Sequence, residues 1–369
     1  MSRNLWSLAF FLATAFCAWA ADAQRGAAVL RNESCLDCHS IRGVGGEGGV
    51  APRTRIAPDL GKPLVPAYTA PALAAALWNH TPAMWAEMSA RVMARPAPSE
   101  ADWADAFAYL YSLQFLEHAG QARRGRQLFE SKHCAECHSV ENGAPGRAVT
   151  AWARLDDPVK LVHQMWNHAS SMKKEFAGRK EWSKLTGRDL LDLTVYFQTV
   201  QNLPPNIEFS LPDPASGRSA VVENCAQCHA GPLALATLLQ NKTWMDVGAG
   251  LWNHEPLLQS VPVISEADMR GILAYVWELQ YRGPEGRVSR GERVFEDKGC
   301  ISCHRSPTPR ATALSPRPGK TFTPFSMVAL GWGSGREMHR QMQEKGVLWP
   351  HLSAEDVSNL VAYMITLNR

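Results

Sequence analysis

The chain contains four pentapeptides of one pattern, and the first is Cys35-Leu36-Asp37-Cys38-His39. The others are Cys134-Ala135-Glu136-Cys137-His138, Cys225-Ala226-Gln227-Cys228-His229 and Cys300-Ile301-Ser302-Cys303-His304. In each, two residues separate the cysteines, and a histidine follows the second cysteine directly. Eight of the nine cysteines belong to these motifs. Because the histidine recurs at the same place every time, the pattern indicates one chemical purpose repeated four times.

Cys-x-x-Cys-His is the attachment signature of c-type haem. Two thiols at this spacing can add to the two vinyl groups of one porphyrin, and the adjacent imidazole can bind the iron as its proximal ligand. Paired Cys-x-x-Cys units can also hold zinc, and a single unit can exchange disulfides, but neither use explains the histidine. We therefore expect four covalent haem c groups. The expected attachment residues are Cys35, Cys38, Cys134, Cys137, Cys225, Cys228, Cys300 and Cys303, and the expected proximal ligands are His39, His138, His229 and His304.

Length and composition narrow the class of protein. A chain of 369 residues is expected to hold more than one domain, and a hydrophobic content of 46% is ordinary for a globular protein. The formal net charge of +3 is too small to indicate a nucleic-acid partner, so none is expected. Each haem would add two propionates, which the sequence count leaves out, so the loaded protein is expected to be more acidic than the chain.

The N-terminal region predicts a secretory signal peptide over residues 1–23. A charged start at Arg3 is followed by the apolar run Leu5–Ala21. Small residues near the end of this run fit cleavage after Ala20 or Ala23.

Two alternatives exist for this segment. Cys17 could carry a lipid, although the bulky Phe16 before it disfavours that, and the segment could remain as an uncleaved anchor, although it is short for a full span. No later stretch approaches spanning length. We expect a mature chain without a transmembrane segment, located in the periplasm, because haem c is attached outside the cytoplasm.

The same order of signals surrounds each motif, so the chain reads as four copies of one unit. A glycine and an apolar pair before the motif predict a short helix that ends there. A tryptophan follows after a variable loop, and a Ser/Thr-x-x-Asp pattern opens a closing helix with a tyrosine ten residues further on. The glycines are Gly26, Gly125, Gly217 and Gly291, and the tryptophans are Trp78, Trp166, Trp252 and Trp332. The capping residues are Ser99, Thr186, Ser265 and Ser353, and the tyrosines are Tyr109, Tyr196, Tyr275 and Tyr363.

This order resembles the class I, single-haem c-type cytochrome domain, in which a helix, Cys-x-x-Cys-His, a loop, an axial methionine and a closing helix follow one another. The resemblance covers nearly all of the mature chain, four times over. It implies an all-α protein of four tandem domains, each wrapped around one covalent haem. The expected domains are 24–118, 119–207, 208–283 and 284–369. The proline-rich stretch Leu203–Pro214 is the clearest linker.

The resemblance also implies that a methionine supplies the second axial bond to iron. Six residues after the repeated tryptophan stand the expected ligands Met84, Met172 and Met338. A methionine on a helix more often fills a core, but its recurrence at one offset favours these three. The nearby alternatives are Met88, Met165 and Met342.

The third copy departs from this pattern, because Leu258 stands where the methionine is expected. We expect His254 to be the ligand there, with Met245, Met269, another residue or an open position as alternatives. A second imidazole would make this haem the low-potential member, because methionine ligation raises the potential. An open position would instead admit a small molecule to the iron.

Two further residue sets are expected beside the haems. His80 and His168 occupy the place of His254 in copies one and two, one helical turn before the expected methionine. They are expected to hydrogen-bond a propionate or pack beside the ring without binding iron. Near the first motif, Ala57–Leu60 resembles the family loop in which a proline, here Pro58, supplies a backbone carbonyl to the proximal histidine.

A six-coordinate haem has no vacant position for a substrate, and its ordinary task is one-electron transfer. We expect an exported tetrahaem carrier, not an enzyme, which passes electrons between a respiratory donor complex and a terminal acceptor. Its expected partners are redox proteins, among them a membrane-bound respiratory complex. One alternative is a haem enzyme that reduces peroxide or nitric oxide at an open third iron, and another is a fixed subunit of a larger membrane complex.

The glycine-rich stretch Gly43–Gly49 lacks the Lys and Ser/Thr of a phosphate loop and predicts only a surface loop.

Overall fold

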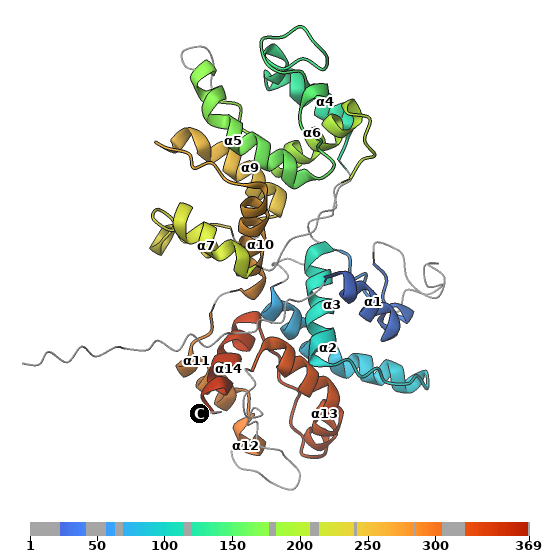
Figure 1. The fold of residues 1–369 in the computed structure, drawn as a ribbon. Helices are drawn as coiled ribbons and strands as arrows, with labels where there is room; N and C mark the ends of the chain where they lie inside the picture. Colours follow the sequence, from blue (N-terminus) through green and yellow to red (C-terminus); the bar gives the residue numbers. More distant parts are fainter. Residues whose placement is uncertain are drawn as a thin grey trace, which may run out of the picture.

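The computed structural model describes residues 23–41, 57–62, 69–113, 120–176, 182–206, 214–239, 242–283, 285–304 and 322–367. Over these ranges the chain is helical and contains no β-strand, which confirms the expected all-α class (Figure 1). None of the described helices is both long and apolar enough to cross a bilayer. The signal peptide up to residue 22, Gly43–Gly49 and the domain boundary at His118 lie outside the described residues.

Each motif follows a ten-residue first helix, and each copy ends in a closing helix, with a middle helix between them. The first helices are α1 (Ala23–Asn32), α4 (Ala122–Ser131), α7 (Ala215–Asn224) and α11 (Val288–Asp297). The middle helices are α2 (Ala70–Ala90), α5 (Pro158–Phe176), α9 (Trp244–His254) and α13 (Pro324–Glu344). The closing helices are α3 (Glu100–Leu113), α6 (Gly187–Val200), α10 (Glu266–Arg282) and α14 (Ala354–Thr366). Short turns of helix complete the units: η1 (Cys35–Asp37), η3 (Cys134–Glu136), η4 (Val149–Ala151), η5 (Gly231–Leu233), α8 (Leu235–Leu238), η6 (Glu255–Leu257) and α12 (Ile301–His304).

The capping pattern expected for the closing helices is confirmed. At the start of α6, the Thr186 side chain accepts a hydrogen bond from the backbone N–H of Asp189, 3.1 Å away. The Asp189 carboxylate accepts one from the backbone N–H of Thr186 in return, at 3.0 Å. Ser99 and Ser353 form the same reciprocal arrangement, and Ser265 accepts the forward bond. Aspartate therefore forms the return bond that glutamate more often makes in this capping box.

Each first helix crosses its closing helix at the repeated glycine. A Cβ atom on Gly125 would lie 2.6 Å from Cβ of Tyr196 and closer still to the carbonyl oxygen of Asp192. The equivalent contacts join Gly26 to Asp105 and Tyr109, Gly291 to Asn359 and Tyr363, and Gly217 to the backbone of Gly271. Only glycine admits so close an approach of two backbones. This crossing explains why the glycine and the tyrosine recur at fixed places in the sequence.

The four copies pack as two pairs: copy one with copy four, at opposite ends of the chain, and copy two with copy three, which follow one another. Helix α2 packs on α13 and α14 while α13 packs on α3, so copies one and four share one hydrophobic core (Figure 1). Helix α5 packs on α9 and α10 while α9 packs on α6, so copies two and three share another. Within each pair the middle helix of one copy contacts the middle and closing helices of the other, and the reverse also holds. Such reciprocity is the mark of a two-fold interface.

The last turn of α10 joins the two pairs. The ring of Tyr111 in α3 lies 5.0 Å, between centroids, from the rings of both Trp277 and Tyr281. Tyr281 is 5% exposed and belongs to the core of copies one and four, although α10 is the closing helix of copy three. Copy three therefore contributes to both cores.

Candidate metal centres

Every Cys-x-x-Cys-His motif is folded into one tight turn at the end of a first helix. The backbone N–H of the histidine donates to the carbonyl oxygen of the first cysteine in all four copies, at 2.8–3.0 Å. Before the first cysteine, Ser34, His133 and Gly299 have φ values of 56°, 65° and 75°, which stops the helix and starts the turn. The sequence thereby brings two thiols and one imidazole onto a single turn, four times.

The motif cysteines are free thiols, and all eight lie in the described residues. Burial raises the pKa of Cys35 to about 12 and that of Cys134 to about 11. Burial also raises the pKa of Cys225 and of Cys300. Because the thiolate is the nucleophile in disulfide exchange, the raised pKa of each first cysteine counts against a thiol-exchange role.

In the first three copies, the motif histidine has one ring nitrogen on a backbone carbonyl. Nδ1 of His39 lies 2.9 Å from the carbonyl oxygen of Pro58, which confirms the expected acceptor. The same bond joins His138 to Arg147 at 3.2 Å and His229 to Leu233 at 3.0 Å. With Nδ1–H donating, the lone pair of Nε2 is available for a metal. The sequence did not reveal Arg147 and Leu233, because a backbone carbonyl leaves no side-chain signal.

A second imidazole faces the motif histidine in each of these three copies. The ring centroids are 6.2 Å apart for His39 and His80, 5.8 Å for His138 and His168, and 5.8 Å for His229 and His254. The facing histidines come from the middle helices α2, α5 and α9. Burial lowers the pKa of His39, His168 and His254, so the neutral form that binds metals is favoured at these residues.

Two of the methionines expected as ligands, Met84 and Met172, lie one helical turn beyond a facing histidine. Met84 in α2 and Met172 in α5 are half-buried and pack against the cores of their pairs. Met338 in α13 is half-buried, and Ser334 stands where copies one to three have histidine. The alternatives named for copy three, Met245 and Met269, are 4% and 0% exposed and belong to the core shared by copies two and three.

The Trp-Asn dipeptides before the facing histidines bind the partner copy. In the pair formed by copies two and three, Trp166 Nε1 donates to the carbonyl of Pro262 at 2.9 Å. Asn167 donates to the carbonyl of Ile264 at 2.8 Å and accepts from its N–H at 3.0 Å. The reciprocal bonds join Trp252 to the carbonyl of Ser183 and Asn253 to both backbone groups of Leu185. We call these bonds the Trp–Asn clamp.

Copies one and four have the same clamp with one bond set missing. Trp78 Nε1 donates to the carbonyl of Pro350 at 2.8 Å, and Asn79 bonds both backbone groups of Leu352 at 2.8 Å. In the reverse direction Trp332 Nε1 donates to the carbonyl of Pro96 at 2.8 Å, but Gly333 replaces the asparagine. The residue opposite Gly333, at the place of Leu352, is Pro98, which has no backbone N–H to offer. This half of the clamp therefore lacks the asparagine side chain in copy four, and it also lacks the backbone N–H in copy one that the amide oxygen would bind.

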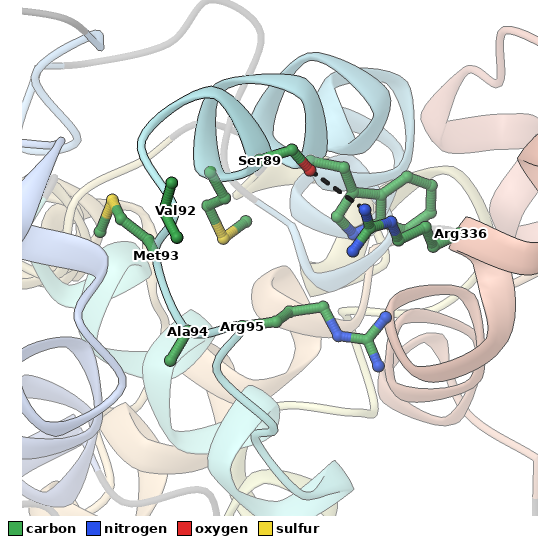
Figure 2. Close-up of a pocket in the computed structure, with 8 residues that line it drawn as sticks. Ser89, Val92, Met93, Ala94, Arg95 and Arg336 are labelled. Atoms are coloured by element: carbon green, nitrogen blue, oxygen red, sulfur yellow. Dashed lines mark hydrogen bonds between the residues drawn. The ribbon is translucent and has the colours of Figure 1, made fainter.

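A cavity of about 450 Å³ lies where α2 ends against α13 (Figure 2). Val92 and Met93 lie on one side of it, and Arg95 and Arg336 lie on the other. Arg336 donates to the Ser89 hydroxyl at 3.2 Å. Apolar side chains facing two guanidinium groups suit an amphipathic anion. The motif cysteines and histidines are not among the residues that line this cavity.

The donor set of each motif fits haem c, because two free thiols and an imidazole are the groups that covalent haem attachment requires. Within the described ranges, no group of three or more His, Cys, Asp or Glu side chains is arranged to hold a metal ion. Compared with protein-family models, with curated proteins and with solved structures, the chain gives no match. The assignment of function therefore depends on the motifs and on their geometry.

Proposed function

We propose that this protein is an exported c-type cytochrome with four haems that carries electrons between redox partners in the periplasm. The observation that supports it most strongly is the fourfold turn of two free thiols and one imidazole. In this proposal the eight motif cysteines form the thioether links, and His39, His138, His229 and His304 bind the irons. Bound haem would supply one-electron redox chemistry.

The helix arrangement supports a cytochrome c-like unit around each motif. First and closing helices cross at glycine and tyrosine in copies one, two and four, and at two glycines in copy three. We propose that the units correspond to residues 24–118, 119–207, 208–283 and 284–369, each enclosing one haem. The residues of each unit would bury the porphyrin and exclude water from the metal, and in the first three copies a backbone carbonyl would orient the imidazole through its Nδ1 bond.

The pairing of the copies determines which sites exchange electrons most directly. The Trp–Asn clamp joins copy one to copy four and copy two to copy three. Electrons would therefore cross within these pairs, not only from each copy to the next in the sequence. Helix α10 also packs into the core of copies one and four, so side chains in contact connect the two pairs and would carry electrons between them.

The alternative of a haem enzyme with an open third iron has less support. His254 faces His229 at 5.8 Å, so copy three offers a second imidazole just as copies one and two do. No separate observation favours a catalytic role for copy three.

Redox titration of the full-length protein, expressed with a cytochrome c maturation system, tests this proposal. We expect reversible uptake of one electron for each motif, and no binding of carbon monoxide to the reduced native protein. The Cys225→Ala/Cys228→Ala variant should take up one electron fewer, whereas Ser302→Ala, inside the fourth motif, should behave like wild type. A protein that takes up no electrons reversibly, or that binds carbon monoxide at the third site, would contradict the proposal as stated.

A further inference from the structure

We infer that His80, His168 and His254 are the second axial ligands of the first three sites, and that a methionine, Met338, serves only the fourth. This inference rests on the proposed function, because it concerns haem iron. It replaces Met84 and Met172 as the expected ligands in copies one and two. It also gives all three histidines of the Trp-Asn-His sequences one shared role.

The separation of the facing rings is that of two imidazoles on one metal. A metal–imidazole nitrogen bond is about 2 Å long, so two bonds in line, with half a ring at each end, separate the ring centroids by about 6 Å. The three pairs measure 6.2, 5.8 and 5.8 Å. The same separation recurs in three different copies, which chance packing of surface histidines does not explain.

The facing histidines have no other polar task among the described residues. His80, His168 and His254 make no hydrogen bond there, so both ring nitrogens of each remain available. Two other described histidines are engaged: His163 contacts the carbonyl of Ile264 at 3.0 Å, and His133 contacts the carboxylate of Glu136 at 2.8 Å. An imidazole with neither nitrogen engaged, about 6 Å from a second imidazole between ring centroids, is suited to share a metal with it.

The Trp–Asn clamp explains why the histidine faces its own motif. Two residues along an α-helix correspond to a rotation of about 200°, so Trp166 and His168 lie on nearly opposite faces of α5. Trp166 is bonded to the partner copy through Pro262, and this fixes the rotation of the helix. His168 is therefore directed back toward His138. The same two-residue step separates tryptophan from histidine in copies one and three.

Copy four differs in a way that leaves a thioether as its ligand. Gly333 and Ser334 replace the asparagine and histidine, while Met338 keeps the six-residue offset from Trp332. His339, the histidine nearest to this position, packs against the rings of Trp85 and Trp349, at 6.2 and 5.5 Å. Because methionine raises the potential relative to a second imidazole, the fourth site would have the highest potential of the four. Electrons would collect there, beside copy one.

Near-infrared magnetic circular dichroism of the oxidised full-length protein tests the inference, because bis-histidine and histidine–methionine haems give separate charge-transfer bands. We expect three bis-histidine haems and one histidine–methionine haem. Three methionine-type haems would overturn the inference while leaving the proposed function intact. A protein with no haem bands at all would overturn the proposed function itself.

Paired variants in copy two identify the ligand directly. His168→Ala should convert one of the four irons to a carbon monoxide-binding form, and added imidazole should reverse this change. Met172→Ala, one turn away on the same helix, should leave the spectrum of the wild-type protein unchanged. The opposite result, with Met172→Ala opening the iron and His168→Ala leaving it low-spin, would contradict the inference.

Discussion

The indole N–H of Trp166 donates a hydrogen bond to the carbonyl of Pro262, 2.9 Å away, across the interface between copies two and three. The adjacent Asn167 bonds both backbone groups of Ile264, two residues further on. Trp252 and Asn253 return the same bonds to the other copy. A sequence feature that looks like part of a ligand motif therefore also holds two repeat units together.

The Asn167→Ala variant should lower the free energy of unfolding by about 1 to 3 kcal/mol. It removes the two hydrogen bonds to Ile264 and leaves the N–H of Ile264 unsatisfied at a half-buried interface, whereas the carbonyl of Ile264 keeps its contact with His163. Denaturant unfolding followed by circular dichroism measures the change. The control is Gly333→Ala in copy four, where no asparagine bond exists and a Cβ atom meets open space, so little loss is expected. Equal losses in the two variants would show that the clamp bonds do not stabilise the pair.

The missing half of the clamp can be rebuilt. Gly333→Asn alone should recover at most the bond from the amide N–H to the carbonyl of Pro98, because the amide oxygen finds no N–H at Pro98. Combined with Pro98→Ala, the same substitution should give a favourable coupling energy of about 1 kcal/mol in a double-mutant cycle. Thermal and denaturant unfolding of the four proteins of the cycle measure it. A coupling energy of zero would mean that the introduced asparagine and the restored N–H at residue 98 do not bind each other.

Gly125→Ala should destabilise the protein by about 2 to 3 kcal/mol, because the new methyl group overlaps the backbone of α6 at Asp192. The matched control is Gly250→Ala in α9, where a Cβ atom has no neighbour within 4 Å. That control should gain about 0.5 to 1 kcal/mol, since alanine is favoured over glycine inside a helix. Unfolding in guanidinium distinguishes them, and a Gly125→Ala protein as stable as wild type would refute the close helix crossing.

Acid should remove part of the stability at the start of α6. Burial disfavours the charged form of Asp189, but hydrogen bonds from Thr186 and Arg124 outweigh it and hold the pKa of Asp189 below its ordinary value. A carboxyl with a lowered pKa in the folded state contributes stability above its unfolded pKa of about 4, and this contribution is lost as pH falls through the folded value. Asp189→Asn should therefore be less stable at pH 7 and lose less stability upon acidification. Parallel stability profiles for the two proteins between neutral and acidic pH would contradict this.

The features that the sequence predicted correctly are local ones. The caps at Thr186 and Ser353 depend on residues three apart, and the glycine and tyrosine offsets repeat within each copy. The carbonyl of Pro58 was predicted because a proline marks its place near His39. The domain boundaries and the haems remain predictions.

The pairing of the copies could not be predicted in the same way. The atoms that Trp166 and Asn167 bind are backbone atoms almost a hundred residues away, and backbone groups leave no pattern of side chains. The sixth ligand was ambiguous for a related reason. His80 and Met84 lie one turn apart on the same face of α2, so their spacing alone does not decide between them. Only the placement of His80 opposite His39 distinguishes them.

The central claim is that each Cys-x-x-Cys-His turn carries a covalently bound haem, and the intact mass of the purified, exported protein tests it most directly. We expect the mass of the mature chain plus four haems, with one haem fewer for each motif whose cysteines are replaced by alanine. A colourless protein with the mass of the unmodified chain would contradict the account.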